Sequence, residues 1–405
     1  MKLIVAHNFY QQAGGEDTVF AQEVQLLRNA GHEVVTYTRS NKEIEHYGIV
    51  DKALLAPRTI WSTRSQSEFC AVLDRECPDV VHFHNTFMQM SPSVYAACKD
   101  RNIPVVQTLH NFRLCCPQGS FFRDGAPCED CTTKGLWTGI RHKCYRGSRL
   151  GTATVAAMIA VHRAAGTWRN MVDCYISLSN FARERIVASS GIPAHKIHVK
   201  PNFVAPDPGV RTRSADYALS VGRLGAEKGT STLLSAWKAL AGAMPLRIIG
   251  DGPRRAQMEA RCANEDIRNV SMLGHVSRAE VIQQLRSARF LVFTSECYEN
   301  FPMSIVEAFA CGVPVIASNI GSTAEIVRNE VTGLTFKPGD PDDLARCVRW
   351  ALAHPDTVDD MGRRARVEFE RKYTAARNYE MLMGIYAKAM KAKPLTEPVA
   401  VPEVA

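Results

Sequence analysis

The chain has 405 residues and a net charge of +8, from 49 Lys and Arg against 41 Asp and Glu. Apolar residues make up 46% and charged residues 22%, which are ordinary globular values and exclude wholesale disorder. The length excludes a small disulfide scaffold and predicts two or three domains. The thirteen cysteines are odd in number and scattered, so we expect reduced thiols and a cytoplasmic protein.

The sequence predicts neither a secretion signal nor a membrane span. The opening apolar residues meet His7 and Asn8 before the core of a signal peptide could form. The longest charge-free apolar candidate, Leu150 to Val161, has twelve residues, whereas a membrane-spanning helix needs about 20.

The first half of the chain alternates short apolar runs with helical patterns. The opening run is followed by Gly14 and Gly15 and then by apolar residues at helical spacing, which predicts a strand, a glycine loop and a helix. Continuous apolar strands that alternate with helices indicate a parallel sheet covered on both faces. A long loop, residues 110–149, interrupts this pattern and precedes a helix at 152–172. The predicted strands of this half are residues 2–6, 33–38, 80–84, 104–109 and 175–178.

The second half repeats the alternation after a segment of linker composition. Residues 197–209 are rich in Pro, with Pro201-Asn202 at their centre, and we place the domain boundary there. The predicted strands of this half are residues 217–221, 246–249, 270–273, 290–293 and 314–317, and the predicted helices are 230–240, 253–263, 278–287 and 303–310.

This pattern predicts an α/β protein with two Rossmann-like, doubly wound domains that face a cleft. Ligands bind outside the carboxyl ends of the strands in such sheets, so the cleft is the expected active site. The expected N-terminal domain spans residues 1–203 and contains a Cys-rich insert, 110–149. The expected C-terminal domain spans 204–375. We further expect a helix at 376–393 that packs back on the N-terminal domain and a disordered tail at 394–405.

Two glutamates with seven residues between them form the strongest chemical signal. Glu299 follows a predicted strand, Pro302 suits the first turn of a helix, and Glu307 lies inside that helix. A helix N-terminus at this edge of a sheet favours a phosphate. Carboxylates beside it can accept hydrogen bonds from sugar and ribose hydroxyls. The alternative is a pair of solvated glutamates at the start of a helix.

A second signal lies on the loop after the strand that ends at Val221. Arg223 and Lys228 both occupy this strand-to-helix loop, where a planar guanidinium and an ammonium can neutralise a diphosphate. Gly250 ends the next strand, and we expect its backbone to approach a ligand closely.

The cysteines of the long loop form a separate group. Cys128 and Cys131 have two residues between them, with Cys116 and Cys144 at either side. This spacing predicts a structural zinc held by four thiolates, with Cys115 as a substitute for Cys116. A set of buried thiols is the alternative.

Positive charge is concentrated between residues 131 and 172, where there are seven Lys or Arg and no Asp or Glu. Such a surface predicts an anionic neighbour, and we expect peripheral contact with the inner face of the cell membrane. In the alternative, the helix in this segment packs into its own domain and its cations are only solvated. The expected membrane face consists of Ala153, Val155, Ala156, Ile159 and Ala160, flanked by Arg149, Arg163 and Arg169.

Taken together, these motifs resemble the retaining glycosyltransferases of family 4, which have the GT-B fold. The Cys-rich insert is similar to that of enzymes of exopolysaccharide and capsule assembly. Asn300 and Pro302 stand where many members of the family carry glycines. Further matching segments are Gly14-Gly15-Glu16, Gly31 to Val34, Asp79 to His84, Leu109-His110-Asn111, Pro201-Asn202, Gly250 to Pro253, Gly274 to Ser277 and Ala308 to Val315.

The resemblance implies transfer of a sugar from a nucleoside-diphosphate sugar to a saccharide or lipid-linked acceptor, with its anomeric configuration kept and without a catalytic metal. It implies that Glu307 binds the donor ribose, that Glu299 binds the donor sugar and that His110 lies near that sugar. The implied catalytic residues are Glu299, His110, Arg223 and Lys228. The implied donor-binding residues are Gly14, Gly15, Arg223, Lys228, Gly250, His275, Val276, Glu299, Asn300, Phe301, Pro302, Met303, Ser304 and Glu307.

Two other functions remain open at this stage. A non-hydrolysing sugar-nucleotide epimerase of the same fold would release an altered nucleotide sugar without an acceptor. The Cys group and the basic stretch also suit a zinc-dependent nucleic-acid-binding protein, but only Trp137 and Tyr145 interleave with the basic residues there, so no nucleic-acid partner is expected.

Overall fold

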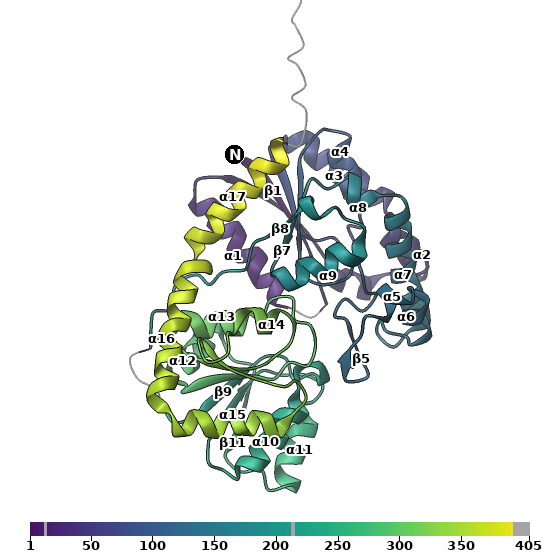
Figure 1. Ribbon diagram of the computed structural model, residues 1–405. Coiled ribbons are helices and arrows are strands. Elements are labelled where there is room, and N and C mark those ends of the chain that lie inside the picture. Colours follow the sequence, from purple (N-terminus) through teal and green to yellow (C-terminus); the bar gives the residue numbers. More distant parts are fainter. Residues whose placement is uncertain (12–13, 212–214, 392–405) are drawn as a thin grey trace, which may run out of the picture.

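The computed structural model describes residues 1–11, 14–211 and 215–391. Two α/β domains lie one above the other, and a pair of long C-terminal helices runs along one side of both (Figure 1). Each domain is built on a six-stranded sheet in which all strands are parallel. The prediction of two doubly wound α/β domains is therefore confirmed.

The N-terminal sheet has the strand order β2-β1-β3-β4-β7-β8. Its central strands β3 and β4 are buried along their whole length because helices cover both faces of the sheet. The strands are β1 (Lys2–Phe9), β2 (Glu33–Ser40), β3 (Val80–Asn85), β4 (Val105–Leu109), β7 (Cys174–Ser177) and β8 (Ile197–Val199). The helices are α1 (Gly15–Asn29), η1 (Asn41–His46), α2 (Ile49–Ile60), α3 (Thr63–Glu76), α4 (Ser93–Lys99), α7 (Arg149–Ala164), α8 (Thr167–Asn170), α9 (Asn180–Ser190) and η2 (Ala194–Lys196).

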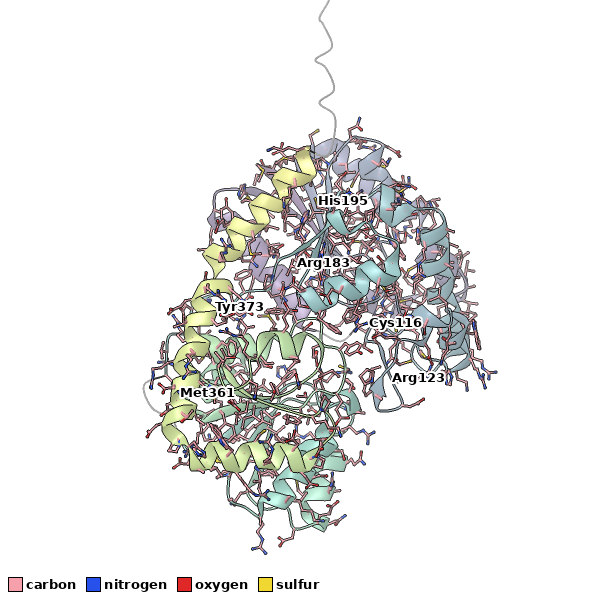
Figure 2. All side chains as sticks on the ribbon, in the orientation of Figure 1. Cys116, Arg123, Arg183, His195, Met361 and Tyr373 are labelled. Atoms are coloured by element: carbon pink, nitrogen blue, oxygen red, sulfur yellow. The ribbon has the colours of Figure 1, made fainter. Side chains whose placement is uncertain are left out.

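The Cys-rich insert lies between β4 and α7. It consists of an antiparallel pair, β5 (Phe122–Arg123) and β6 (Ala126–Pro127), and two short helices, α5 (Asp130–Thr133) and α6 (Trp137–Arg141). α6 packs against α7, and Figure 2 shows Cys116 and Arg123 at the side of the N-terminal domain that faces the C-terminal domain.

The C-terminal sheet has the strand order β11-β10-β9-β12-β13-β14. The strands from β9 to β11 follow one another toward one edge of the sheet, and those from β12 to β14 toward the other edge, so the order switches between β9 and β12. A crevice opens at such a switch point, at the carboxyl ends of the two strands. The strands are β9 (Ala218–Val221), β10 (Leu246–Ile249), β11 (Val270–Gly274), β12 (Phe290–Phe293), β13 (Val315–Ser318) and β14 (Gly333–Phe336). The helices are η3 (Ala226–Lys228), α10 (Thr230–Leu240), α11 (Arg255–Asn264), α12 (Arg278–Ser287), α13 (Met303–Ala310), α14 (Gly321–Ile326), α15 (Pro341–Ala353), α16 (Pro355–Lys372) and α17 (Ala375–Lys391).

The last two helices connect the domains. α16 packs against α13 of the C-terminal domain, whereas α17 places Leu382, Ile385 and Tyr386 in the core of the N-terminal domain. Tyr373 lies at the junction of the two helices (Figure 2), and its carbonyl accepts a hydrogen bond from Val204 N at 3.1 Å. The interdomain linker and the helix junction therefore lie together, so the chain crosses between the domains twice at one place.

Several C-terminal elements match the prediction to the residue, namely α10, β10, α12, β12 and α13. The N-terminal half departs from it in two places. The segment assigned to the linker contains β8, a strand of three residues that pairs only with β7 at the sheet edge. The helix predicted at 152–172 is two helices, because Gly166 adopts a left-handed conformation with φ 65° between α7 and α8.

The membrane face proposed for α7 is wrong. Val155, Ala156 and Ile159 are buried in the N-terminal domain, and the first and last of these belong to its main core cluster. Arg163 donates a hydrogen bond to the Leu114 carbonyl at 3.2 Å. The apolar face of α7 is therefore used for folding, as the alternative interpretation held.

Within the described ranges, no helix combines the length and the apolar character needed to cross a lipid bilayer. The expected tail, residues 394–405, lies outside the described residues.

Candidate active site

A cleft of about 630 Å³ lies between the carboxyl edges of the two sheets. Its C-terminal wall is formed by the loops after β9 and β12 and by the start of α13. Its N-terminal wall is formed by the start of α1 and by the residues after β4. The cleft brings together most of the predicted site residues, namely Gly14, Gly15, His110, Arg223, Lys228, Glu299, Asn300, Phe301, Pro302, Met303, Ser304 and Glu307.

Lys228 and Glu299 form an ion pair at the switch point. Lys228 Nζ lies 2.5 Å from Glu299 Oε1, and Ser295 Oγ donates to the same oxygen at 2.6 Å. Burial alone would raise the pKa of the Glu299 carboxyl, but the Lys228 ammonium and these hydrogen bonds bring it below its usual value. Glu299 is therefore an ionised acceptor at neutral pH, facing the cleft.

Arg223 is the second cation of this wall. Its side chain is 57% exposed, and its guanidinium pairs with the carboxylate of Glu227 on the same loop. Because an exposed ion pair is worth little, a polyanionic ligand can take over the guanidinium at small cost.

Helix α13 points its N-terminus at the cleft. Met303 and Ser304, in its first turn, both line the cleft, and no side chain caps this end. Such backbone N–H groups and the positive end of the helix dipole favour an anion. Glu307, one turn further on, has its pKa raised by burial, although Arg278 at 3.6 Å acts against this shift.

Asn300 ties the two domains together across the base of the cleft. Its Nδ2 donates to the carbonyl of Leu109, the last residue of β4, at 2.5 Å. A glycine at position 300 would lack this bond, so the departure from the family pattern has a structural consequence. A second interdomain link joins Ser179 Oγ and Ser322 Oγ at 2.6 Å.

The N-terminal wall presents the start of α1. Gly14 is the N-cap residue, and no atom of the described chain lies within 4 Å of the position where its Cβ would stand. The glycines therefore leave space for a ligand beside the first turn of α1, although the N–H of Gly14 itself donates to Asp17 Oδ2 at 2.9 Å. Glu16 also lines the cleft, and burial, followed by repulsion from Asp17, raises its pKa to about 8.

His110 follows β4 and stacks on His84, with its Nε2 3.0 Å from His84 Nδ1. Burial and the neighbouring histidines hold the pKa of His110 well below its usual value, so the ring is neutral. The wall opposite the two cations thus offers a neutral imidazole.

Two family descriptions match the chain one after the other. "Glycosyltransferase Family 4" matches residues 13–208, and "Glycosyl transferases group 1" matches residues 210–368. The chain belongs to the GT-B glycosyltransferases of the family 4 type.

Curated relatives agree with this assignment. The D-rhamnosyltransferase WbpZ of Pseudomonas aeruginosa is 33% identical over 161 residues, which are 39% of this chain and 42% of the relative. The sulfoquinovosyl transferase SQD2 of Arabidopsis thaliana is 23% identical over 384 residues, covering 91% of this chain and 70% of the relative. The match to WbpZ, and those to two other curated glycosyltransferases of similar identity, span less than half the length of these relatives.

The Anabaena protein Alr3699/HepE, solved in complex with UDP and glucose, has the same fold. Its TM-score is 0.68 at 14% sequence identity, over 95% of this chain and 99% of the other. At this identity the likeness shows the fold alone.

Three predicted site residues of this glycosyltransferase lie outside the cleft described above. Gly250 is required for close packing of neighbouring strands, because a Cβ there would stand 1.9 Å from the Gly222 carbonyl oxygen. Its backbone therefore approaches the end of the neighbouring strand closely. Val276 packs against the C-terminal core. His275 lines a wider, more open part of the interdomain space.

Several residues that line the cleft were not predicted as site residues, although Glu16 and Asn111 stand in segments that match the family. Each of them follows a parallel strand at its carboxyl end, and this position was the available signal. They are Tyr10 and Glu16 after β1, Asn111 and Arg113 after β4, and Thr294 and Ser295 after β12.

The four thiols of the insert lie near one another. Burial raises the pKa of the Cys144 thiol to about 11, and the thiols of Cys131, Cys116 and Cys128 act in the same direction. Cys115 instead lies beside α9. The structure thus favours Cys116 over Cys115 as a member of the group.

Two other groups bring three ligand atoms within 4.8 Å of one another in the described part of the chain: Glu23 with two histidines, His82 and His84, and His7 with Glu16 and Asp17. Neither group includes a cysteine, so in the described part of the chain no three of these thiols all lie within 4.8 Å of one another. The zinc site stays a prediction, as does catalysis without a metal.

Proposed function

We propose that this protein transfers a sugar from a nucleoside-diphosphate sugar to a saccharide or lipid-linked acceptor, with retention of the anomeric configuration, in the synthesis of a cell-surface polysaccharide. The observation that carries the proposal is the Lys228–Glu299 pair at the switch point of the C-terminal sheet. The pair places a cation for a diphosphate beside an ionised carboxylate for a sugar, in a cleft with helix N-termini on both walls.

The leaving diphosphate is the group that needs most stabilisation in such a transfer. Arg223 and Lys228 reach it from the loop after β9, and the N-terminus of α13 adds N–H donors. These charges supply the stabilisation that a divalent ion gives elsewhere, which supports catalysis without a metal.

The donor's hydroxyls are matched by the two glutamates. Glu299 accepts hydrogen bonds from the sugar, because Lys228 and Ser295 keep it ionised. Glu307 lies one helical turn beyond the phosphate-binding end of α13, in reach of a ribose. The acceptor enters from the N-terminal wall, and retention and the polysaccharide pathway are proposed from the family and from the Cys-rich insert.

The test is a transfer assay with radiolabelled nucleoside-diphosphate sugars and a panel of lipid-linked and soluble saccharide acceptors. The expected result is a labelled glycoside whose anomeric configuration, determined by NMR, equals that of the donor. An inverted product would contradict retention. An altered nucleotide sugar formed without any acceptor would identify an epimerase instead.

We also propose that Cys116, Cys128, Cys131 and Cys144 bind one structural zinc. The four thiols lie near one another, and the insert has short elements and little apolar sequence of its own, so a metal would add to its stability. Elemental analysis of protein purified without chelator should find about one zinc per chain, and a Cys128→Ser/Cys131→Ser variant should lose it. Wild-type protein without bound metal would refute the site.

A peripheral contact with acidic lipid is proposed for a surface other than the apolar face of α7. Ile49 is 89% exposed on α2, and Leu150 is 77% exposed on α7. The two helices pack against each other, and His162 Nε2 near the end of α7 lies 2.7 Å from the carbonyl of Ile60 at the end of α2. The basic residues next to Leu150 in the sequence add attraction to an anionic surface.

Co-sedimentation with acidic and neutral vesicles tests this contact. Binding to acidic vesicles at low salt, lost at high salt and in an Ile49→Ser/Leu150→Ser variant, is the expected result. Arg169→Ser, at the far end of this region, is the control. Absence of binding to acidic vesicles at low salt would exclude the contact.

A further inference from the structure

A chain of buried polar groups leads from the interior of the N-terminal domain to His110 at the cleft. Glu23 on α1 lies with its Oε1 3.3 Å from His84 Nε2, and His84 Nδ1 lies 3.0 Å from His110 Nε2. Glu23 and His84 are almost entirely buried. None of the functions assigned above uses Glu23 or His84, although burying a carboxylate is costly unless it is paired.

The far end of this chain is fixed by a buried ammonium. Lys200 Nζ lies 2.8 Å from Glu23 Oε2 and donates to Asn378 Oδ1 of α17 at 3.2 Å. His82 also approaches Glu23, with its Nδ1 3.1 Å from Oε1 and 2.8 Å from the hydroxyl of Tyr386. The carboxylate therefore faces one full positive charge and two imidazoles.

The direction of each hydrogen bond follows from the number of hydrogens available. Lys200 keeps Glu23 ionised and its pKa far below the usual value in spite of burial, so Glu23 only accepts. Glu23 Oε1 and His84 Nε2 are both buried and lie 3.3 Å apart, and in the described ranges neither atom has a hydrogen bond of standard geometry, their mutual contact included. The hydrogen of His84 therefore lies on Nε2. In the other tautomer, the lone pair of His84 Nε2 would face the lone pairs of Glu23 Oε1 at 3.3 Å.

The same reasoning fixes His110. Burial lowers the pKa of His84 to about 4, so this ring is neutral and carries one N–H. Its Nδ1 is then an acceptor, and the facing Nε2 of His110 must donate to it. Since His110 is neutral as well, its Nδ1 has no hydrogen. Within the described chain that atom has no partner, while the residue lines the cleft.

We propose that Glu23 and His84 are positioning residues that fix the tautomer of His110, so that its Nδ1 accepts a hydrogen bond from a hydroxyl of the bound donor sugar. The inference rests on the proposed sugar transfer for its ligand, but the tautomer itself follows from the protein alone. It implies a preference for donor sugars that present a hydroxyl at this position over deoxy sugars that lack it.

A Glu23→Gln variant should exchange donor and acceptor at each step from residue 23 through His84 to His110. Lys200 needs an acceptor, so the amide oxygen of Gln faces Lys200 and the amide NH₂ faces His84 Nε2. His84 then carries its hydrogen on Nδ1 and donates to His110 Nε2, which moves the hydrogen of His110 to Nδ1. The cleft would then present a donor where the wild type presents an acceptor.

The test combines NMR of ring-¹⁵N-labelled histidines with kinetics, and a His110→Gln variant assigns the His110 signals. The expected result is Nε2–H for His110 in the wild type and Nδ1–H in Glu23→Gln. The turnover number of the variant should fall about ten- to hundred-fold, while its affinity for the nucleoside diphosphate, which has no sugar, changes less than about two-fold. Glu23→Asp, which keeps an acceptor, should restore the wild-type tautomer.

Tyr386→Phe is the matched control, because it removes a buried hydroxyl from His82 and leaves the path from Glu23 to His110 intact. It should keep the His110 tautomer and the turnover number. Nδ1–H on His110 in the wild type would overturn the proposal even if no variant folds, and so would an unchanged tautomer in folded Glu23→Gln. If the wild type shows Nε2–H and transfers no sugar from any donor, the proposed function fails and the tautomer assignment stands.

Discussion

The two walls of the cleft hold their functional side chains in different ways. On the C-terminal wall, Arg223, Lys228 and Glu299 lie on loops directly after strands, and the partner of each is in the same loop or on the loop beside it. On the N-terminal wall, His110 is oriented through Glu23 and Lys200, which come from α1 and from the end of β8. The first arrangement is local and accessible to the ligand, whereas the second is long-range and buried.

This difference predicts different consequences of mutation. Changes on the C-terminal wall should remove contacts with the donor and affect binding and turnover directly. Changes behind the N-terminal wall should leave nucleotide binding intact and alter how the sugar is held. Variants of each wall test whether the two walls differ in this way.

Lys228→Ala should have the largest effect. It removes a cation from the diphosphate and leaves the Glu299 carboxylate without its ion-pair partner, so kcat/KM should fall about 10²- to 10³-fold. Steady-state kinetics against Lys238→Ala, which breaks an exposed pair with Glu265 in the same domain, checks this. A loss below about three-fold would remove Lys228 from the site.

Glu299→Gln should lower turnover by about 100-fold and leave affinity for the free nucleoside diphosphate within a few-fold of wild type. The carboxylate is assigned to the sugar, and the amide that replaces it is a weaker acceptor. Calorimetry with the diphosphate and kinetics with the full donor separate the two effects. Equal losses in both measurements would contradict the assignment.

Arg223→Ala and Glu307→Ala should each weaken nucleoside-diphosphate binding about ten-fold, the loss of one charge-assisted hydrogen bond. Both residues are on the ligand side of the wall and contribute little to the core, so thermal unfolding should be unchanged. Unchanged affinity in both variants would place the nucleotide elsewhere.

The pH dependence of donor binding should follow the titration of the Glu16 carboxyl on the N-terminal wall. Burial and Asp17 raise its pKa to about 8, whereas Arg113 acts in the other direction. Below pH 8 the side chain is neutral, and above it an anion faces the diphosphate. The KM for the donor should therefore rise several-fold between pH 7 and pH 9, and Glu16→Gln should remove that rise. A rise that persists in the variant would assign the titration to another group.

The sequence was sufficient for the C-terminal wall. Its elements have clear apolar periodicity, so α10 and α13 were predicted to the residue, and the structure brings the predicted site residues Lys228 and Glu299 together at the cleft. The N-terminal wall was harder for a physical reason. Glu23, His84 and His110 meet only because the sheet places β3 beside β4 with α1 against them, and periodicity does not give strand order.

Two other errors have the same origin. The sequence predicts a membrane surface for the apolar face of α7 because amphipathicity does not tell whether a helix contacts lipid or its own domain. β8 was read as linker because a strand of three residues at an edge, beside Pro201, has the composition of a loop.

If the cleft is the donor site, its C-terminal wall binds the diphosphate of the nucleotide. Calorimetry of the full chain with UDP, GDP, ADP and dTDP, and with the corresponding monophosphates, measures this binding. We predict that one diphosphate binds at least ten-fold more tightly than its monophosphate, and that Lys228→Ala abolishes this difference. Equal binding of the two nucleotides by the wild type, or a preference that survives in Lys228→Ala, would contradict the claim.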